Sequence, residues 1–450
     1  MKKLSEPIIA SIKGYSKSGD GTARVQHRHR LQVIGAAVGD KVQVRIIRNE
    51  RTHLLAKIVE ILESAPTRVK PKCIHAGTCG GCRFQHISYD EQLKIKQDSI
   101  EELFPTYPVN PIIGCDNIWH YRGKMEYTFS KDQGGNQFLG LIECGSYGRV
   151  LDMKECFLAP KKFMPILNLV KAWFVKHNLE PYSSIKCEGN LKSIAFRGDL
   201  QVTLTLASRL PTEIEQELIA ILKDHATSIY INLHVAKRGM RSTQELIHIY
   251  GDTHFYEELQ VAGKKLKLCA MPYSFMQPNP KQSQVILEEA IKMVDPKGNE
   301  TVLDLYSGVG TIGLAFASYV KKVIAIEIVK EAKENAIRNC EYNQIKNLEF
   351  IASDVKDALL DDELKKKLQD LDVMIVDPPR GGIEPKAMRE LLRLKAKKIL
   401  YISCNPKTQA ADIKELEKEY KVGKIQPIDQ FPHTIHTENL IILFRKSQQM

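Results

Sequence analysis

The stretch TVLDLYSGVGTIGLAFASYVKKVIAIEI, residues 301–328, decides the fold of the C-terminal half of the chain. It contains a short apolar strand, a glycine-rich turn, an amphipathic helix and a second apolar strand. Strands that are apolar on both faces belong to parallel sheets covered by helices on both sides. The stretch therefore predicts one strand–helix–strand unit of a doubly wound α/β sheet.

The same alternation continues on both sides of this stretch. A helix-like segment precedes it at 283–294, and helix-like and strand-like segments alternate from 330 to 406. The later strands end in ASD (352–354), DPPR (377–380) and SCNP (403–406). Ligands of open α/β sheets bind at the carboxyl ends of the strands, so these residues are the candidates for a site.

The N-terminal half has a different pattern. Residues 1–64 hold about five short strands between Gly and Asp turns, which predicts a small barrel of the OB type. Residues 65–90 are irregular. From 117 to 265 the pattern is rich in strands, with two helices expected over 164–177 and 211–225. We expect a separate α+β domain there.

The charge of the chain is concentrated near its start. Residues 1–72 contain 15 Lys and Arg against 6 Asp and Glu, a balance of +9 in a chain whose net charge is +11. A basic module on a nearly neutral body favours binding to a nucleic acid. No run of 18 apolar residues occurs and the start lacks a signal-peptide pattern, so we expect a cytoplasmic protein without a membrane span.

Carboxylates end several of the predicted strands. Asp304 lies near the end of the first strand, and Glu327, Asp354 and Asp377 end the second, third and fourth strands. A ring of negative charge disfavours a polyphosphate cofactor and suits a neutral or cationic nucleoside. We therefore expect S-adenosylmethionine at this edge. Arg380 follows the two prolines at the position where amino-methylating enzymes usually have an aromatic residue, which disfavours attack through an exocyclic amine.

Cys404 ends the fifth strand and should lie at the same edge. A thiolate there can add to C6 of a uracil ring and make C5 reactive toward a methyl donor. A base must then remove the C5 proton so that the thiol can leave. The candidates in the tail are Glu438, His433 and His436, and we favour the carboxylate.

The chain holds ten cysteines, and in a reducing compartment we do not expect them to form a disulfide framework. Cys73, Cys79 and Cys82 form a C-x5-C-x2-C pattern in an irregular loop, which predicts a metal site for zinc or an iron–sulfur cluster. The spacing leaves the fourth ligand open, with Cys115 and Cys144 among the candidates. The remaining cysteines are expected to be packing residues: Cys187, Cys269 and Cys340.

The motifs SFMQPN, DLYSGVGTIGL, DPPR, SCNP and HTEN occur in this order over residues 274–439. In these motifs the chain resembles the RNA uracil-5-methyltransferase family, and most closely its 23S ribosomal RNA branch. The resemblance implies a Rossmann-like methyltransferase domain in which Cys404 is the nucleophile and Glu438 the general base. It also implies contacts to S-adenosylmethionine from six residues: Gln277, Tyr306, Thr311, Glu327, Asp354 and Asp377.

The resemblance extends to the N-terminal half. It identifies the barrel with the family's RNA-binding TRAM module, and it implies a [4Fe-4S] cluster with Cys156 as its fourth ligand. The expected domains are residues 1–64, residues 65–90 with 117–265, and a catalytic domain of residues 91–116 with 266–450. A monomer that makes 5-methyluridine in 23S rRNA is the expected function. The alternatives are a tRNA uridine as substrate, or a catalytically silent RNA-binding iron–sulfur protein.

Overall fold

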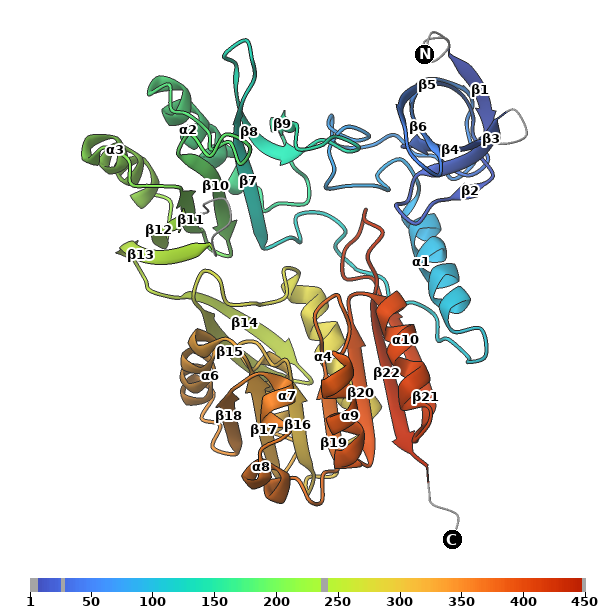
Figure 1. The fold of residues 1–450 in the computed structure, drawn as a ribbon, viewed down its shortest axis with the longest axis vertical. Coiled ribbons are helices and arrows are strands. Elements are labelled where there is room, and N and C mark those ends of the chain that lie inside the picture. The colour runs from blue at the N-terminus through green and yellow to red at the C-terminus, as the bar shows by residue number, and fades with distance from the viewer. Residues whose placement is uncertain (1–6, 26–28, 236–241, 447–450) are drawn as a thin grey trace. The chain divides into compact units, whose positions relative to one another are not determined.

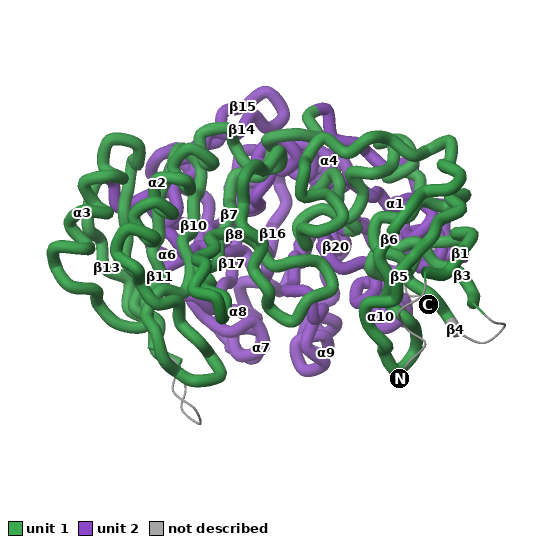
Figure 2. The backbone as a smooth tube through the Cα atoms, turned by 90° about the horizontal axis from the view of Figure 1, so that it is seen from above, with its two compact units in different colours: residues 1–94, 117–251, 431–435 green, residues 95–116, 252–430, 436–450 purple. Residues whose placement is uncertain are grey.

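The computed structural model describes residues 7–25, 29–235 and 242–446. Its chain forms two compact units. Unit 1 consists of residues 1–94, 117–251 and 431–435, and unit 2 of residues 95–116, 252–430 and 436–450 (Figure 2). Helix α1, Tyr89–Leu103, runs across the boundary between residues 94 and 95. No helix in the described part of the chain combines the length and apolar composition that a membrane span requires.

The first strands of unit 1 form a six-stranded sheet in the order β1-β5-β6-β4-β3-β2, and Figure 1 shows it curled into a partial barrel. Its strands alternate between buried and less buried residues: Val42 and Val44 are buried in the core together with Leu31 and Val33, while the residue between the members of each pair is only partly buried. The strands are β1 Ile8–Ser11, β2 Gly14–Tyr15, β3 Gly21–Val25, β4 His29–Ile34, β5 Lys41–Asn49 and β6 Leu54–Glu63.

A second sheet of unit 1 has seven strands in the order β13-β12-β11-β10-β7-β8-β9, antiparallel except for the β11–β12 pair. Helices α2, Phe163–Lys176, and α3, Thr212–Lys223, contribute buried residues to its core, close to the ranges expected from the sequence. The strands are β7 Lys124–Lys131, β8 Gln137–Ile142, β9 Val150–Asp152, β10 Leu191–Arg197, β11 Gln201–Leu206, β12 Ser228–Val235 and β13 Thr243–Gly251.

Unit 2 is built on a seven-stranded sheet in the order β18-β17-β16-β19-β20-β22-β21 (Figure 1). The strands from β18 to β20 are parallel, and β22 is antiparallel to both of its neighbours. The sequence pattern suggested a sheet that is parallel throughout. This expectation was wrong for β22, which is antiparallel. Its strands are β16 Thr301–Leu305, β17 Lys322–Glu327, β18 Leu348–Ala352, β19 Val373–Val376, β20 Lys398–Ser403, β21 Tyr420–Ile428 and β22 Glu438–Arg445.

Each face of this sheet has its own core, as expected of a doubly wound fold. Alternate residues of β16 show the pattern: Val302 packs in the cluster that contains α4 and α5, and Leu303 packs in the cluster that contains α7, α9 and α10. The helices are α4 Pro280–Val294, α5 Thr311–Ala317, α6 Lys330–Tyr342, α7 Val355–Ala358, α8 Asp362–Lys367, α9 Pro385–Leu394 and α10 Pro406–Leu416.

A two-stranded sheet, β14 Phe255–Val261 with β15 Lys264–Ala270, precedes α4. The domain boundary that the sequence placed between residues 265 and 266 falls inside β15. The strands stay together because they pair along their whole length, from Phe255 opposite Ala270 to Val261 opposite Lys264, and because their buried residues join the core around α4. Unit 2 accordingly resumes at Asp252.

Candidate active site

The glycine-rich turn after β16 is held by two carboxylates. Asp304 accepts a hydrogen bond from the Gly313 N–H at 2.9 Å, and Glu327 accepts one from the Gly308 N–H at 3.0 Å and another from the Val329 N–H at 2.9 Å. Gly308 and Gly310 adopt φ values of 55° and 82°, which favour glycine. Tyr306 also has a positive φ, 63°, and such strain in a non-glycine residue is often kept at functional sites.

The carboxylates at the strand ends repel one another electrostatically. Burial raises the pKa of Asp304 to about 8, and the charges of Asp377 and Glu327 add to the effect. Burial also raises the pKa of Asp377 to about 7. One oxygen of Asp304, Oδ1, is buried without a hydrogen-bond partner in the described structure. A cationic or hydrogen-donating ligand at this edge would relieve both costs.

The other residues expected at the cofactor surround the same strand ends. Gln277 lies just before α4, and its Oε1 accepts a hydrogen bond from Nε2 of buried Gln430 at 3.2 Å. Thr311 is the first residue of α5. Asp354 caps α7 by accepting a hydrogen bond from the Lys356 N–H at 2.9 Å, so part of its role is local and structural.

The strand register brings Cys404 and Glu438 together. Ser403, the last residue of β20, pairs with Asn439 of antiparallel β22. Cys404 follows Ser403 and Glu438 precedes Asn439, so the two residues are opposite each other at the end of the ladder. Glu438 is 1% exposed, and its Oε1 has no hydrogen-bond partner in the described structure. A thiol and a buried carboxyl group thus face the same strand end.

The charges around Cys404 oppose one another. Burial raises the pKa of the Cys404 thiol, and the carboxylates of Glu438 and Asp377 raise it further. The Arg380 guanidinium lowers it through its charge and a hydrogen bond. Glu438 has a pKa well above its usual value because of burial and Asp377, again opposed by Arg380. Arg380 is therefore the group that favours the thiolate.

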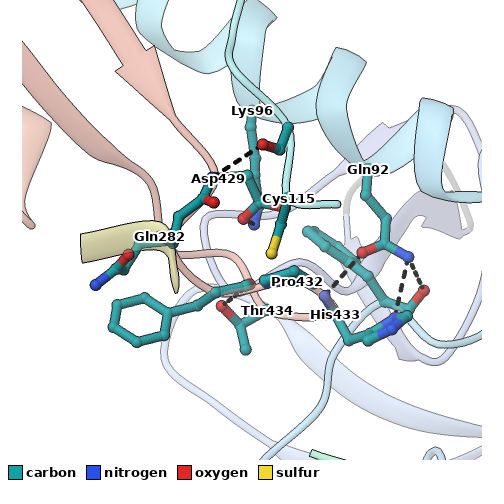
Figure 3. A network of polar contacts seen from close by, with 12 residues as sticks. Gln92, Lys96, Cys115, Gln282, Asp429, Pro432, His433 and Thr434 are labelled. Carbon is teal, nitrogen blue, oxygen red and sulfur yellow. Dashed lines mark hydrogen bonds and ion pairs between the residues drawn. The ribbon is translucent and has the colours of Figure 1, made fainter. Parts of the chain in front are cut away.

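The two histidines considered as bases lie on the segment before Glu438. His433 is buried in unit 1, where Gln92 donates to its Nδ1 at 3.2 Å and accepts from its N–H at 2.8 Å (Figure 3). Its ring stacks on Trp119 with a centroid distance of 4.0 Å. His436 is partly exposed in unit 2, two residues before Glu438. Only Glu438 has a register position opposite Cys404.

Unit 1 holds a second cluster of chemically active side chains. Cys73, Cys79, Cys82 and Cys156 line one cavity of about 200 Å³. Burial raises the pKa of Cys73 to about 11, that of Cys82 to about 12 and that of Cys79 in the same direction. In the described residues, no group of three His, Cys, Asp or Glu side chains stands ready to hold a metal ion.

Three of these sulfurs already accept hydrogen bonds. The N–H of His75 donates to Cys73 Sγ at 3.4 Å and the N–H of Gly81 to Cys79 Sγ at 3.4 Å. Gln85 Nε2 donates to Cys82 Sγ at 3.1 Å. Donors of this kind stabilise sulfur in its thiolate form and set the potential of a bound cluster. These donors could not be predicted from the sequence, because they depend on the fold of the loop.

The remaining cysteines do not line the cavity of Cys73, although Cys144 lines a second, smaller pocket together with Cys79 and Cys82. Cys144 accepts a hydrogen bond from Arg83, and Cys115 belongs to unit 2, 3.8 Å from Nδ2 of Asn279. Cys269 is buried and Cys340 is partly buried. Cys187 is exposed, so its interpretation as a packing residue was wrong; it lies in a turn with a φ of 57°.

The sequence alone did not identify two residues of the site in unit 2. Arg380 was recognised only as the residue that replaces an aromatic, and its contact with Cys404 requires the fold. Gln430 meets Gln277 across 153 positions of sequence, so no local pattern could have indicated it.

The strand order, the glycine-rich turn and the strand-end carboxylates define a class I S-adenosylmethionine-dependent methyltransferase fold. A family model described as tRNA (Uracil-5-)-methyltransferase matches residues 88–446. The chain therefore belongs to the family of RNA uracil-5-methyltransferases.

Similar proteins agree with this assignment. An uncharacterized RNA methyltransferase of Protochlamydia amoebophila is 34% identical over 433 residues, covering 90% of this chain and 98% of the relative. One from Clostridium tetani is 32% identical over 451 residues, covering 96% and 95%. The crystal structure of Pyrococcus abyssi tRNA (uracil-54, C5)-methyltransferase in complex with S-adenosyl-L-homocysteine has the same fold, with a TM-score of 0.78, 24% identity and coverage of 97% and 99%.

Proposed function

We propose that this protein methylates C5 of a specific uridine in 23S ribosomal RNA through a covalent Cys404 adduct. The observation that supports this most directly is the β20–β22 register, which sets Cys404 opposite Glu438. Arg380 and Asp377 act electrostatically on both. A nucleophile, a base and a cation at one strand end match the needs of methylation at an unreactive ring carbon.

The first task of the residues is to generate a thiolate. Because burial and two carboxylates raise the pKa of Cys404, the thiol is mostly protonated without help. Arg380 opposes this effect, and its backbone carbonyl is fixed by Asn405 Nδ2 at 2.8 Å. Attack of the thiolate on C6 forms the S–C6 bond and moves the ring electrons toward C5 and the O4 carbonyl.

The second task is to return the enzyme to its starting state. S-adenosylmethionine, when bound, would supply the methyl group that C5 takes up, and would leave as S-adenosylhomocysteine. C5 then carries both the methyl group and its original hydrogen. Glu438 removes this proton, the C5–C6 double bond forms again, and the S–C6 bond breaks to release the Cys404 thiolate. The raised pKa of Glu438 makes its carboxylate a stronger base than an exposed one.

S-adenosylmethionine fits the remaining residues of the edge. The backbone turn held by Glu327 and Asp304 leaves room for close approach of a nucleoside, and the acidic side chains suit a ligand with a sulfonium and an ammonium group. We assign Gln277, Tyr306, Thr311 and Asp377 to its binding as well, with Asp354 as a further contact.

We also propose that Cys73, Cys79, Cys82 and Cys156 hold a [4Fe-4S] cluster. All four line the same cavity, whose volume of about 200 Å³ accommodates a group larger than a single ion. The N–H donors to Cys73, Cys79 and Cys82 would stabilise them as thiolate ligands. Because these cysteines lie far from Cys404 in the sequence, we assign the cluster a structural role.

Ribosomal RNA is the substrate that we favour, because the basic N-terminal strands resemble a TRAM module added to the catalytic domain. A tRNA uridine is the second candidate. The observation that favours it is the Pyrococcus abyssi enzyme, whose name specifies tRNA and whose chain is matched over 99% of its length. The same Cys404–Glu438 pair would serve either RNA.

Mass spectrometry of 5-methyluridine decides between these substrates. Ribosomal RNA and tRNA are purified separately from a deletion strain, from the parent, and from the deletion strain complemented with the wild-type or the Cys404→Ala protein. We expect one 5-methyluridine of 23S rRNA to disappear and to return only with the wild-type protein. Loss confined to the tRNA fraction would establish the second candidate, and no change in either fraction would refute both.

A further inference from the structure

Unit 1 presents a tryptophan outside its hydrophobic core. The chain has two tryptophans. Trp173 is 1% exposed in the core of the seven-stranded sheet, where its indole donates to the Ile214 carbonyl at 3.0 Å. Trp119 lies in the irregular segment before β7 and is partly exposed. A large apolar ring in such a place calls for a reason other than core packing.

One face of Trp119 rests on a rigid support. The His433 ring stacks on it at a centroid distance of 4.0 Å and an interplanar angle of 25°. Both the backbone and the side chain of His433 are bonded by Gln92, as Figure 3 shows. The His433 carbonyl accepts from the N–H groups of Arg83 at 2.7 Å and Phe84 at 3.1 Å. The indole is thus held in place before any ligand arrives.

The surroundings of Trp119 are aromatic and basic. Phe157 packs edge-on against the indole at 6.1 Å between centroids. The ammonium group of exposed Lys72 lies 5.1 Å from the Trp119 centroid and 4.6 Å from the Phe157 centroid. Two more lysines on the same segments, Lys70 and Lys154, are exposed. Rings on which bases can stack, interleaved with cations for phosphates, are the features of a single-strand-binding surface.

We propose that Trp119, Phe157 and Lys72 form a stacking platform for an unpaired nucleobase of the RNA, separate from the Cys404 site. The base stacks on the aromatic surface, and Lys72 swings from the rings to the adjoining phosphate. The charge of Lys72 favours RNA over an apolar peptide, and the rigid His433 support favours a flat ligand. The proposal rests on RNA being the substrate, but it does not depend on which uridine is methylated.

Tryptophan fluorescence tests the platform directly, because Trp173 is shielded in the core. A short single-stranded RNA is titrated into the wild-type protein and into the Trp173→Phe variant, and the RNA duplex of the same sequence serves as comparison. We expect the single strand to quench the fluorescence in both proteins and the duplex to quench it much less. Binding of the single strand without quenching would overturn the proposal.

Variants test the same surface through affinity. Trp119→Ala should weaken binding of the single strand roughly 5- to 150-fold, the range for loss of one stacked base, while Trp119→Phe should restore most of it. Lys72→Ala should reduce the slope of log affinity against log salt by about 0.7, and Lys72→Arg should keep it. The matched control is Lys264→Ala, which removes an exposed lysine 4.4 Å from the Tyr319 centroid in unit 2 and should change nothing.

The outcomes separate this proposal from the proposed function. Quenching by RNA in a protein that methylates no uridine would support the platform and contradict the function. Methylation by a protein whose Trp119 is not quenched would overturn the platform alone. If Trp119→Ala does not fold, the two Lys72 variants and the quenching of the wild-type protein still test the platform. Equal slopes of log affinity against log salt for Lys72→Ala and wild type would contradict the proposal.

Discussion

Replacing Glu438 by glutamine should stop the reaction after the methyl group has been transferred. Glutamine has nearly the same shape as the buried glutamate, so the β22 strand and its packing should be kept. Its amide cannot accept the C5 proton, while Cys404 and Arg380 remain in place to form the S–C6 bond. The variant should therefore accumulate a methylated covalent complex with RNA.

The size of the effect follows from the role of the group. A positioned general base contributes about 10²- to 10⁴-fold to a rate, and we expect turnover to fall by this factor. The free energy of unfolding should not fall in this variant. Folding raises the pKa of Glu438, so in the wild type ionisation of this group lowers the stability as pH rises from the unfolded pKa to the folded pKa. Glu438→Gln should be at least as stable as wild type at alkaline pH.

The assay is denaturing gel electrophoresis of protein incubated with unmethylated RNA and with S-adenosylmethionine whose methyl group is radioactive. Wild type should show little slow-migrating complex and much free methylated RNA, whereas Glu438→Gln should show the reverse. Cys404→Ala is the control and should form no complex. A Glu438→Gln variant that releases methylated RNA at the wild-type rate would refute the assignment of the base.

Three other substitutions test the electrostatics of unit 2. Arg380→Gln should raise the pKa of Cys404 further, so that alkylation by iodoacetamide needs a higher pH than in wild type. Asp304→Asn removes a group whose pKa rises from 3.8 to about 8 on folding. Between these pH values, ionisation of this group lowers the free energy of unfolding of the wild type by about 1.4 kcal/mol per pH unit. The free energy of unfolding of the variant, measured in urea, should therefore depend less on pH. Lys96→Met removes the buried ammonium group that lies 2.5 Å from the Asp429 carboxylate (Figure 3) and should cost about 3–5 kcal/mol in urea unfolding.

Arg380→Gln and Lys96→Met each have their own control and contradicting result. Alkylation of Cys404 is isolated by subtracting the rate of the Cys404→Ala protein. An unchanged alkylation profile in Arg380→Gln would show that the guanidinium does not stabilise the thiolate. For the buried pair, Lys418→Met removes a lysine whose ion pair with Glu415 is exposed, and should cost less than about 1 kcal/mol. Equal costs for Lys96→Met and Lys418→Met would contradict the burial argument.

The sequence by itself determined the α/β class, the strand ends and the chemical types at them. Short apolar strands alternating with amphipathic helices have few arrangements, and the carboxyl ends of parallel strands share one edge. That is why Glu327, Asp377 and Cys404 could be grouped without coordinates. The motifs from Gln277 to Glu438 added the family, which the matched residues 88–446 then established.

Only the tertiary structure decided which residues act on one another. Glu438 becomes the neighbour of Cys404 because β22 enters the sheet antiparallel beside β20, a choice that no local periodicity encodes. The same holds for Arg380, whose influence on Cys404 depends on two loops that follow different strands. The His433 ring stacks on Trp119 in unit 1, although His433 precedes by only a few residues the strand of unit 2 that carries Glu438. Pairing across long sequence distances is set by the packing of the whole unit, and therefore the sequence could name the candidates but not their partners.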